Sequence, residues 1–170
     1  MANNCFYTIK ILGKKDNCQE FVERLESYHK PNHFWRFFDV DVYDEESVGD
    51  LTAMYISGDC AWSLESCCRA SGYSGGVDLF AVNTEELSLS LEAYSREIGM
   101  LFEEHYIYKN GACITDDCRD IDVFWWDRDE YPTYGDFKKD YPDAPPEACF
   151  ADDCEVITGG FGSGYECWHI

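Results

Sequence analysis

Apolar and polar side chains alternate with a period of two in several segments of this sequence, and this pattern restricts the fold more than any other feature. A strand with one buried face alternates in this way because successive side chains point to opposite faces of the sheet. The pattern predicts strands over residues 4–12, 34–43, 51–58, 87–92 and 100–108. The apolar set of the three clearest strands is Tyr7, Ile9, Ile11, Phe38, Val40, Val42, Leu87, Leu89 and Leu91. In the second strand, we expect the other alternate residues to lie on the face opposite Phe38. They are Trp35, Phe37, Asp39, Asp41 and Tyr43.

Helical periodicity separates these predicted strands. Over Asp16–Tyr28 the apolar residues fall on one stripe, and Asp16 stands three residues before Gln19, which is the spacing of a capping box. A second, shorter helix is predicted over Ser63–Ala70, whereas the pattern of Val77–Leu87 is ambiguous.

Turn signals complete the predicted order. We expect a turn through Asp44–Gly49 and a tight hairpin at Asn110-Gly111. The resulting order is β-α-β-β-α-β-β. It predicts an α+β fold of the ferredoxin-like, split β-α-β type, an antiparallel sheet with its helices on one face.

Three segments carry a resemblance to a known family: MANNCFYTIKILG at the start, CAWS at residues 60–63, and LSLSLEAYSREIGMLFEEHYIYKNG at residues 87–111. Over residues 1–118 the chain resembles the YubB-type ferredoxin-like domain family of phages and plasmids. Leu64 and Glu65 stand where the family pattern has two prolines. The resemblance implies a ferredoxin-like fold and an origin in a mobile element, and it implies no catalytic residues.

Residues 119–170 form a C-terminal extension of different composition. They contain 13 acidic and 4 basic residues, and they also contain many aromatic side chains. Because a solvated acidic linker does not need aromatic residues, we expect the extension to pack on the main domain. Pro142–Pro146 is the predicted connector, and ITGGFGSGYECWHI at the end predicts a strand or hairpin laid back on the body.

The net charge of −21 and the pI near 4.2 exclude several classes of partner. Such a surface repels phosphate backbones and anionic lipids, so we expect no direct nucleic-acid binding and no membrane binding. The start of the chain lacks a basic region followed by an apolar stretch, which indicates a cytoplasmic protein of the host cell. In that compartment most of the ten cysteines are expected to be small, buried, reduced side chains.

Two patterns are compatible with metal chemistry but do not require it. ACITDDC and ACFADDC place Cys113, Cys118, Cys149 and Cys154 in two Cys-x4-Cys pairs, which either supply thiolates to zinc or are inward cysteines beside acidic turns. A metal-dependent hydrolase can be assembled from Asp39, Asp41 and His105 only if their strands are neighbours. Since pairing among 34 acidic residues is expected by chance, we predict no catalytic residues, no metal and no cofactor.

The charge suggests the function. A compact chain of this length is about 40 Å across, and about 40 Å of duplex DNA carries roughly 24 phosphate charges. The sequence therefore predicts a non-enzymatic nucleic-acid mimic. Its expected partner is a basic nucleic-acid-binding protein, in particular a host nuclease or CRISPR effector, which an anti-CRISPR or antirestriction protein would inhibit.

The predicted partner-binding residues lie in both parts of the chain. They are Asp39, Asp41, Asp44, Glu45, Glu46, Asp120, Asp122, Trp125, Trp126, Asp127, Asp129 and Glu130. Two alternatives remain open: an interaction module without inhibitory role, and a small metal-dependent hydrolase.

Overall fold

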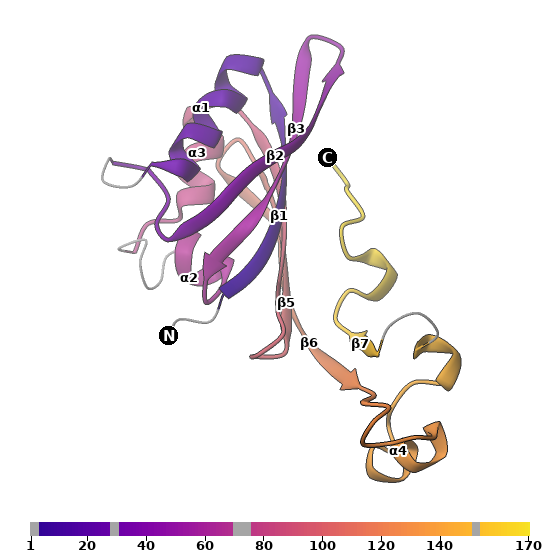
Figure 1. Ribbon diagram of the computed structural model, residues 1–170. Coiled ribbons are helices and arrows are strands. Elements are labelled where there is room, and N and C mark those ends of the chain that lie inside the picture. Colours follow the sequence, from indigo (N-terminus) through magenta and orange to yellow (C-terminus); the bar gives the residue numbers. More distant parts are fainter. Residues whose placement is uncertain (1–3, 28–30, 70–75, 151–153) are drawn as a thin grey trace.

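The computed structural model describes residues 4–27, 31–69, 76–150 and 154–170, and its centre is one curled antiparallel sheet (Figure 1). The seven strands have the spatial order β2-β3-β1-β4-β5-β6-β7. Their bounds are β1 Asn4–Gly13, β2 Phe37–Val48, β3 Leu51–Ala61, β4 Ser90–Glu97, β5 Phe102–Lys109, β6 Ala112–Trp125 and β7 Glu155–Gly159. The predicted α+β class and antiparallel sheet are confirmed.

Four α-helices accompany the sheet in the described ranges: α1 Lys15–Glu26, α2 Leu64–Cys68, α3 Leu79–Glu86 and α4 Tyr134–Asp140. Figure 1 shows α1, α2 and α3 on one face of the sheet and α4 in a separate lobe beyond the end of β6. Ser63 and Asp78 cap α2 and α3, because their side chains accept hydrogen bonds from backbone N–H groups of the first turn. Among the described residues, no helix combines the length with the apolar composition that a membrane span requires.

The main core lies between the sheet and these three helices. Alternate residues of β1 are fully buried there, as the period-two pattern predicted, and Cys18, Phe21 and Leu25 supply the stripe of α1. The buried side chains from β1 and α1 are Cys5, Tyr7, Ile9, Ile11, Cys18, Phe21 and Leu25.

Two local expectations were wrong. Asp44–Gly49 is no turn, because β2 continues to Val48 and the reversal comes at Gly49-Asp50. The strand can contain these acidic residues because all of their side chains reach solvent, while its backbone pairs with β3. Helix α1 begins after Lys14, so Asp16 and Gln19 form no capping box.

The alternation of β2 also differs from the prediction. Phe37 is buried in the core, and Phe38 is only partly buried. Asp39 has a positive φ of 50°, and the pairing with β3 shifts register between Phe38 and Asp41. A bulge of this kind moves later side chains to the other face, which a strict period of two does not anticipate.

The remaining uncertain segment, Val77–Leu87, contains helix α3, and its last residue Leu87 caps that helix. Strand β4 therefore begins at Ser90, later than expected. The hairpin at Asn110-Gly111 is confirmed, with positive φ at both residues, as a two-residue turn of this sequence requires.

Beyond β6 the chain forms a second, smaller core. Trp126, Phe137, Ala144 and Phe150 are buried together, and the indole N–H of Trp126 donates to the carbonyl of Tyr131. We call residues 126–150 the lobe. The predicted boundary at residue 118 falls inside β6, which leads from the main sheet into this lobe.

After β7 the chain crosses the sheet face that carries no helices. We call residues 160–170 the strap. Phe161, Tyr165 and Trp168 all contact the ring of Tyr94 on β4, with centroid separations of 5.9, 5.4 and 5.5 Å. The strap and the helices together explain why residues 91–95 of β4 are buried on both faces.

Candidate functional site

The predicted acidic residues of the first cluster lie on one exposed edge of the sheet. Asp39, Asp41, Asp44, Glu45 and Glu46 belong to β2, which pairs with β3 on one side only. All five are exposed. Glu45 forms a salt bridge with Lys15 at 2.7 Å, and Glu46 accepts a hydrogen bond from the hydroxyl of Tyr55. We call these five residues the β2 acidic row.

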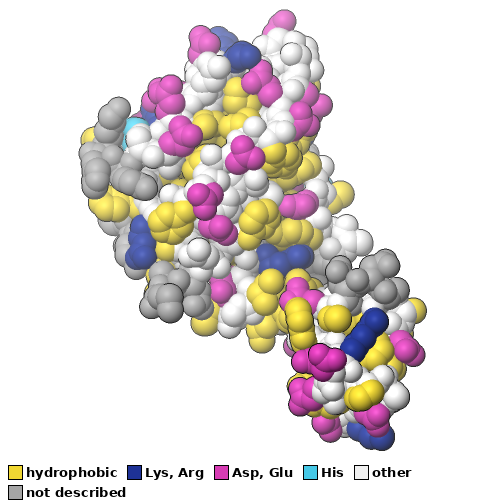
Figure 2. Space-filling model, in the orientation of Figure 1, with side chains coloured by type: hydrophobic (Ala, Val, Ile, Leu, Met, Phe, Trp, Pro, Cys, Tyr) yellow, Lys and Arg dark blue, Asp and Glu magenta, His cyan; other side chains and the backbone are white. Residues whose placement is uncertain are grey.

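The second predicted cluster lies at the other end of the molecule. Asp120 and Asp122 are exposed on β6, and Asp127, Asp129 and Glu130 are exposed in the lobe. Strands β3, β1, β4 and β5 lie between β2 and β6, and Figure 1 shows the β2–β3 hairpin and the lobe far apart. The two clusters therefore do not form one continuous surface. Figure 2 shows acidic side chains spread over both ends of the visible face.

The two neighbouring tryptophans have different environments. Trp125 is 60% exposed, whereas Trp126 is 6% exposed. Trp126, which the sequence offered as a partner-binding residue, is buried and anchors the core of the lobe. Consecutive residues at the end of a strand point to opposite sides, and the lobe folds over the side on which Trp126 lies.

The hydrolase arrangement is not assembled. Asp39 and Asp41 lie on β2 and His105 lies on β5, with three strands between them. His105 instead stacks on Tyr94, with centroids 4.1 Å apart and an interplanar angle of 5°.

The cysteine pairs are not brought together either. All ten thiols belong to described residues and are free; Cys5, Cys18, Cys60, Cys67 and Cys68 are buried, and the other five are not. The second motif extends into residues 151–153, outside the described part of the chain. In the described ranges, no grouping of possible metal-binding side chains includes a cysteine.

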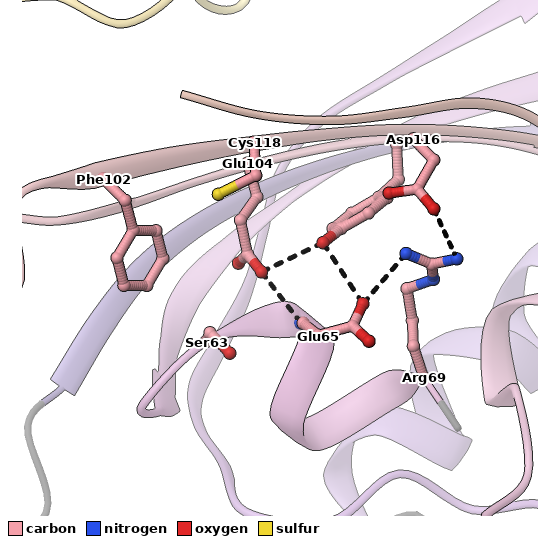
Figure 3. Close-up of a pocket in the computed structure, with 8 residues that line it drawn as sticks. Ser63, Glu65, Arg69, Phe102, Glu104, Asp116 and Cys118 are labelled. Atoms are coloured by element: carbon pink, nitrogen blue, oxygen red, sulfur yellow. Dashed lines mark hydrogen bonds and ion pairs between the residues drawn. The ribbon is translucent and has the colours of Figure 1, made fainter. Parts of the chain in front are cut away.

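A pocket of about 410 Å³ lies between α2 and strands β5 and β6 (Figure 3). Glu104 enters it from β5 and accepts hydrogen bonds from the backbone N–H groups of Leu64 and Glu65 at 2.8 and 3.1 Å, and from the hydroxyl of Tyr106 at 3.0 Å. Burial raises the pKa of Glu104, and these hydrogen bonds oppose that shift. The carboxylate thus caps the first turn of α2.

The same pocket contains Arg69, whose charge is already balanced. Its guanidinium forms ion pairs with Glu65 and Asp116, each at 2.9 Å. The pocket therefore offers no free positive charge to an anionic ligand, and its polar side chains hold α2 against the sheet. The sequence did not indicate this pocket, because its residues come from three separate elements.

One group of side chains in the described residues has the composition and spacing of a metal-binding set: Glu92, His105 and His169, whose ligand atoms all lie within 4.8 Å of one another. They come from β4, β5 and the strap. The two histidines have no ligand spacing in the sequence, because β-sheet pairing and the crossing strap bring these residues together.

Comparison of the chain with known proteins identified no relative. No protein-family model, no curated protein and no solved structure matches the chain. The resemblance to the YubB-type family stays a prediction, and the candidate surface rests on the β2 acidic row and the geometry around it.

Proposed function

We propose that this protein binds the basic nucleic-acid groove of another protein in place of nucleic acid, and that the β2 acidic row is the contacting surface. The observation that carries the proposal is the spacing of charges along the exposed edge strand. Asp44, Glu45 and Glu46 carry one carboxylate per residue. A strand rises about 3.4 Å per residue, which is also the axial spacing of phosphates along one strand of B-DNA, so the carboxylates follow one another along the edge at this interval while alternating between the two faces of the sheet.

The position of the row also favours this function. An edge strand projects its side chains into solvent from both faces, so a partner can approach without displacing another element. Asp39, Asp41 and Asp44 form no salt bridge with any described residue. Their charges therefore remain available to Lys and Arg side chains of a partner.

The charge of the whole chain would accelerate the encounter. A net charge of −21 attracts a basic groove over several ångströms and raises the association rate at low salt. A host nuclease or CRISPR effector has such a groove, and its inhibition is the biological role that we propose. The protein then needs no catalytic residue of its own.

We further propose that β1–β4 follow the split β-α-β plan of ferredoxin-like domains. The order β2-β3-β1-β4, the antiparallel pairing, and the helices after β1 and β3 support this assignment. In this plan the β2 edge is free for a partner.

The experiment compares two triple variants with the same change in net charge. D41K/D44K/E46K reverses three charges of the β2 acidic row, and D129K/E130K/D143K reverses three exposed charges of the lobe. Each is tested, beside the wild type, for binding to a purified nuclease captured from host lysate, with duplex DNA as competitor and over a salt series.

We expect the β2 variant to lose at least tenfold in affinity and the lobe variant to lose much less. Wild-type binding should weaken steeply with salt, and DNA should displace the protein. Equal losses in the two variants would contradict the assignment to β2. A complex that survives molar salt, or a nuclease that still binds DNA while in the complex, would exclude mimicry and favour an interaction module.

A further inference from the structure

Glu92 is a fully buried carboxylate on the sheet face that the strap covers. Its Oε1 atom lies 2.8 Å from Nε2 of His105 and 2.7 Å from Nδ1 of His169. Its Oε2 atom accepts hydrogen bonds from the backbone N–H groups of His169 and Ile170.

The nearby permanent cations have other partners. Lys10 on β1 lies opposite Glu92 on β4 in the sheet register, yet its ammonium group donates to the carbonyl of Ile170. Arg96, further along β4, forms its ion pair with Glu103. Among the described residues, only the imidazoles of His105 and His169 lie within ion-pair distance of the Glu92 carboxylate. A buried negative charge of this kind normally has a cation beside it.

The three side chains are also held in position. The stacked Tyr94 ring fixes the plane of the His105 imidazole, and the two strap N–H groups orient the Glu92 carboxylate. Such supporting contacts are typical of metal ligands, whose orientation depends on the groups behind them. His169 differs, since its side chain is 56% exposed and leaves one side of the cluster open to solvent.

We propose that Glu92, His105 and His169 bind a divalent transition-metal ion, with zinc as the best-suited ion, and that this ion clips the strap to the sheet. Two imidazoles and one carboxylate are a known ligand set for zinc, which then keeps a fourth position for water. Bond lengths of about 2.0–2.2 Å place tetrahedral ligand atoms roughly 3.3 Å apart. The two distances from Oε1 of Glu92 to the imidazole nitrogens must therefore lengthen by about half an ångström, and the exposed His169 side chain can supply that movement.

Metal binding replaces a crowded hydrogen-bond arrangement. Oε1 of Glu92 now faces two imidazole nitrogens and, at 3.4 Å, the hydroxyl of Tyr94. With the ion bound, the proton on each nitrogen that faces Oε1 has moved to solvent or to the other ring nitrogen, so each imidazole presents an unprotonated nitrogen to the metal and the carboxylate oxygen becomes a ligand. One ion then joins β4, β5 and the strap, so it stabilises the folded state in which the strap is closed.

The experiment titrates the chelator-treated full chain with Co²⁺, in a buffer with excess Mg²⁺ that occupies exposed carboxylates. Cobalt reports its ligands: nitrogen and oxygen ligands give visible d–d bands, whereas cysteine adds a thiolate charge-transfer band. We expect one site with d–d bands alone, and His169→Ala should weaken binding by at least about 100-fold. Hydrogen exchange of residues 160–170 should slow when the ion binds.

The variants Glu92→Gln and His105→Gln change buried residues and can fail to fold. His169→Ala still tests the proposal, because the half-exposed side chain of His169 is not part of the core. The double variant C113S/C118S is the control and should bind as the wild type does. Unchanged affinity in His169→Ala would overturn the proposal, and so would a thiolate band that C113S/C118S removes. None of the three ligands belongs to β2, so failure here leaves the proposed mimicry untouched.

Discussion

Single acidic residues have two different roles in this protein. Most of the carboxylates are exposed, but Glu92, Glu103 and Glu104 are nearly fully buried. Glu104 caps α2, Glu103 accepts hydrogen bonds from Arg96 and from the N–H of Phe161, and Glu92 holds the end of the strap. A buried carboxylate is tolerated only with such partners, so these three residues stabilise the architecture instead of contributing to the acidic surface.

Glu104 should make stability depend on pH. Because burial raises its pKa above the ordinary 4.5, the native state keeps a proton that the unfolded chain has already released in that pH window. Its contribution to the free energy of unfolding therefore falls as the pH rises through the window, by at most about 1.4 kcal/mol per pH unit.

The variant Glu104→Gln lacks this titration. Its free energy of unfolding, relative to that of the wild type, should rise with pH above 4.5. Urea denaturation of both proteins at several pH values measures the difference. Parallel curves would show that Glu104 does not titrate differently in the folded and unfolded states.

At the scale of elements, the strap depends on one glycine. Gly160 has a φ of +55°, and a Cβ atom there would meet the carboxylate of Glu103 and lie 2.7 Å from Cγ2 of Ile121. Gly162 has a similar φ of +53° with nothing within 4 Å of the Cβ position. Alanine at either position would have the same backbone strain, because both have a positive φ. Only at position 160 would the added Cβ atom also clash with neighbouring atoms.

Gly160→Ala should therefore destabilise the protein more than Gly162→Ala does. Strain of the backbone alone costs on the order of 1 kcal/mol, and the clash should add about 1–3 kcal/mol. Urea denaturation gives the free energies, and hydrogen exchange over residues 160–170 locates the effect. Equal losses in the two variants would mean that the strap does not pack against Glu103 as described.

The lobe is an element with its own core, which predicts local unfolding. Phe137 is fully buried among Trp126, Tyr134 and Phe150. Phe137→Ala should destabilise the lobe by about 3–5 kcal/mol. Because the main core shares none of its buried residues with this cluster, amides of β1 and β3 should keep their protection while those of residues 126–150 lose it. Loss of protection throughout the chain would show that lobe and sheet unfold together.

For the molecule as a whole, the main electrostatic effect is self-repulsion. Acidic residues outnumber basic ones by 34 to 13, and like charges on both ends of the molecule oppose the compact state. Screening by salt weakens this repulsion, since the Debye length falls to about 8 Å at physiological ionic strength.

We therefore expect the Tm to rise with NaCl concentration, from low salt to about 0.15 M. D41K/D44K/E46K should show a smaller rise than the wild type, because three repelling charges have changed sign. Thermal denaturation followed by circular dichroism measures both. A Tm that falls with salt in the wild type would mean that ion pairs, such as Lys15 with Glu45, outweigh the repulsion.

Local sequence was sufficient for much of this fold. The alternation of Tyr7, Ile9 and Ile11, the stripe of α1 and the turn at Asn110-Gly111 were all predicted, because each depends on neighbours within a few residues. The charge, which motivates the proposed function, is likewise a property of composition alone. The extent of β2 was missed because an acidic stretch resembles a turn until a partner strand pairs with it.

Long-range packing was needed for the rest. Which of Trp125 and Trp126 is buried depends on the lobe that folds around the second of them. Whether Glu92 is a surface acid or a buried anchor depends on the strap, which brings His169, 77 residues further along the chain, to hydrogen-bond distance. A period-two pattern specifies that a strand has two faces, but the burial of the polar face depends on what covers it, and only the folded chain supplies that cover.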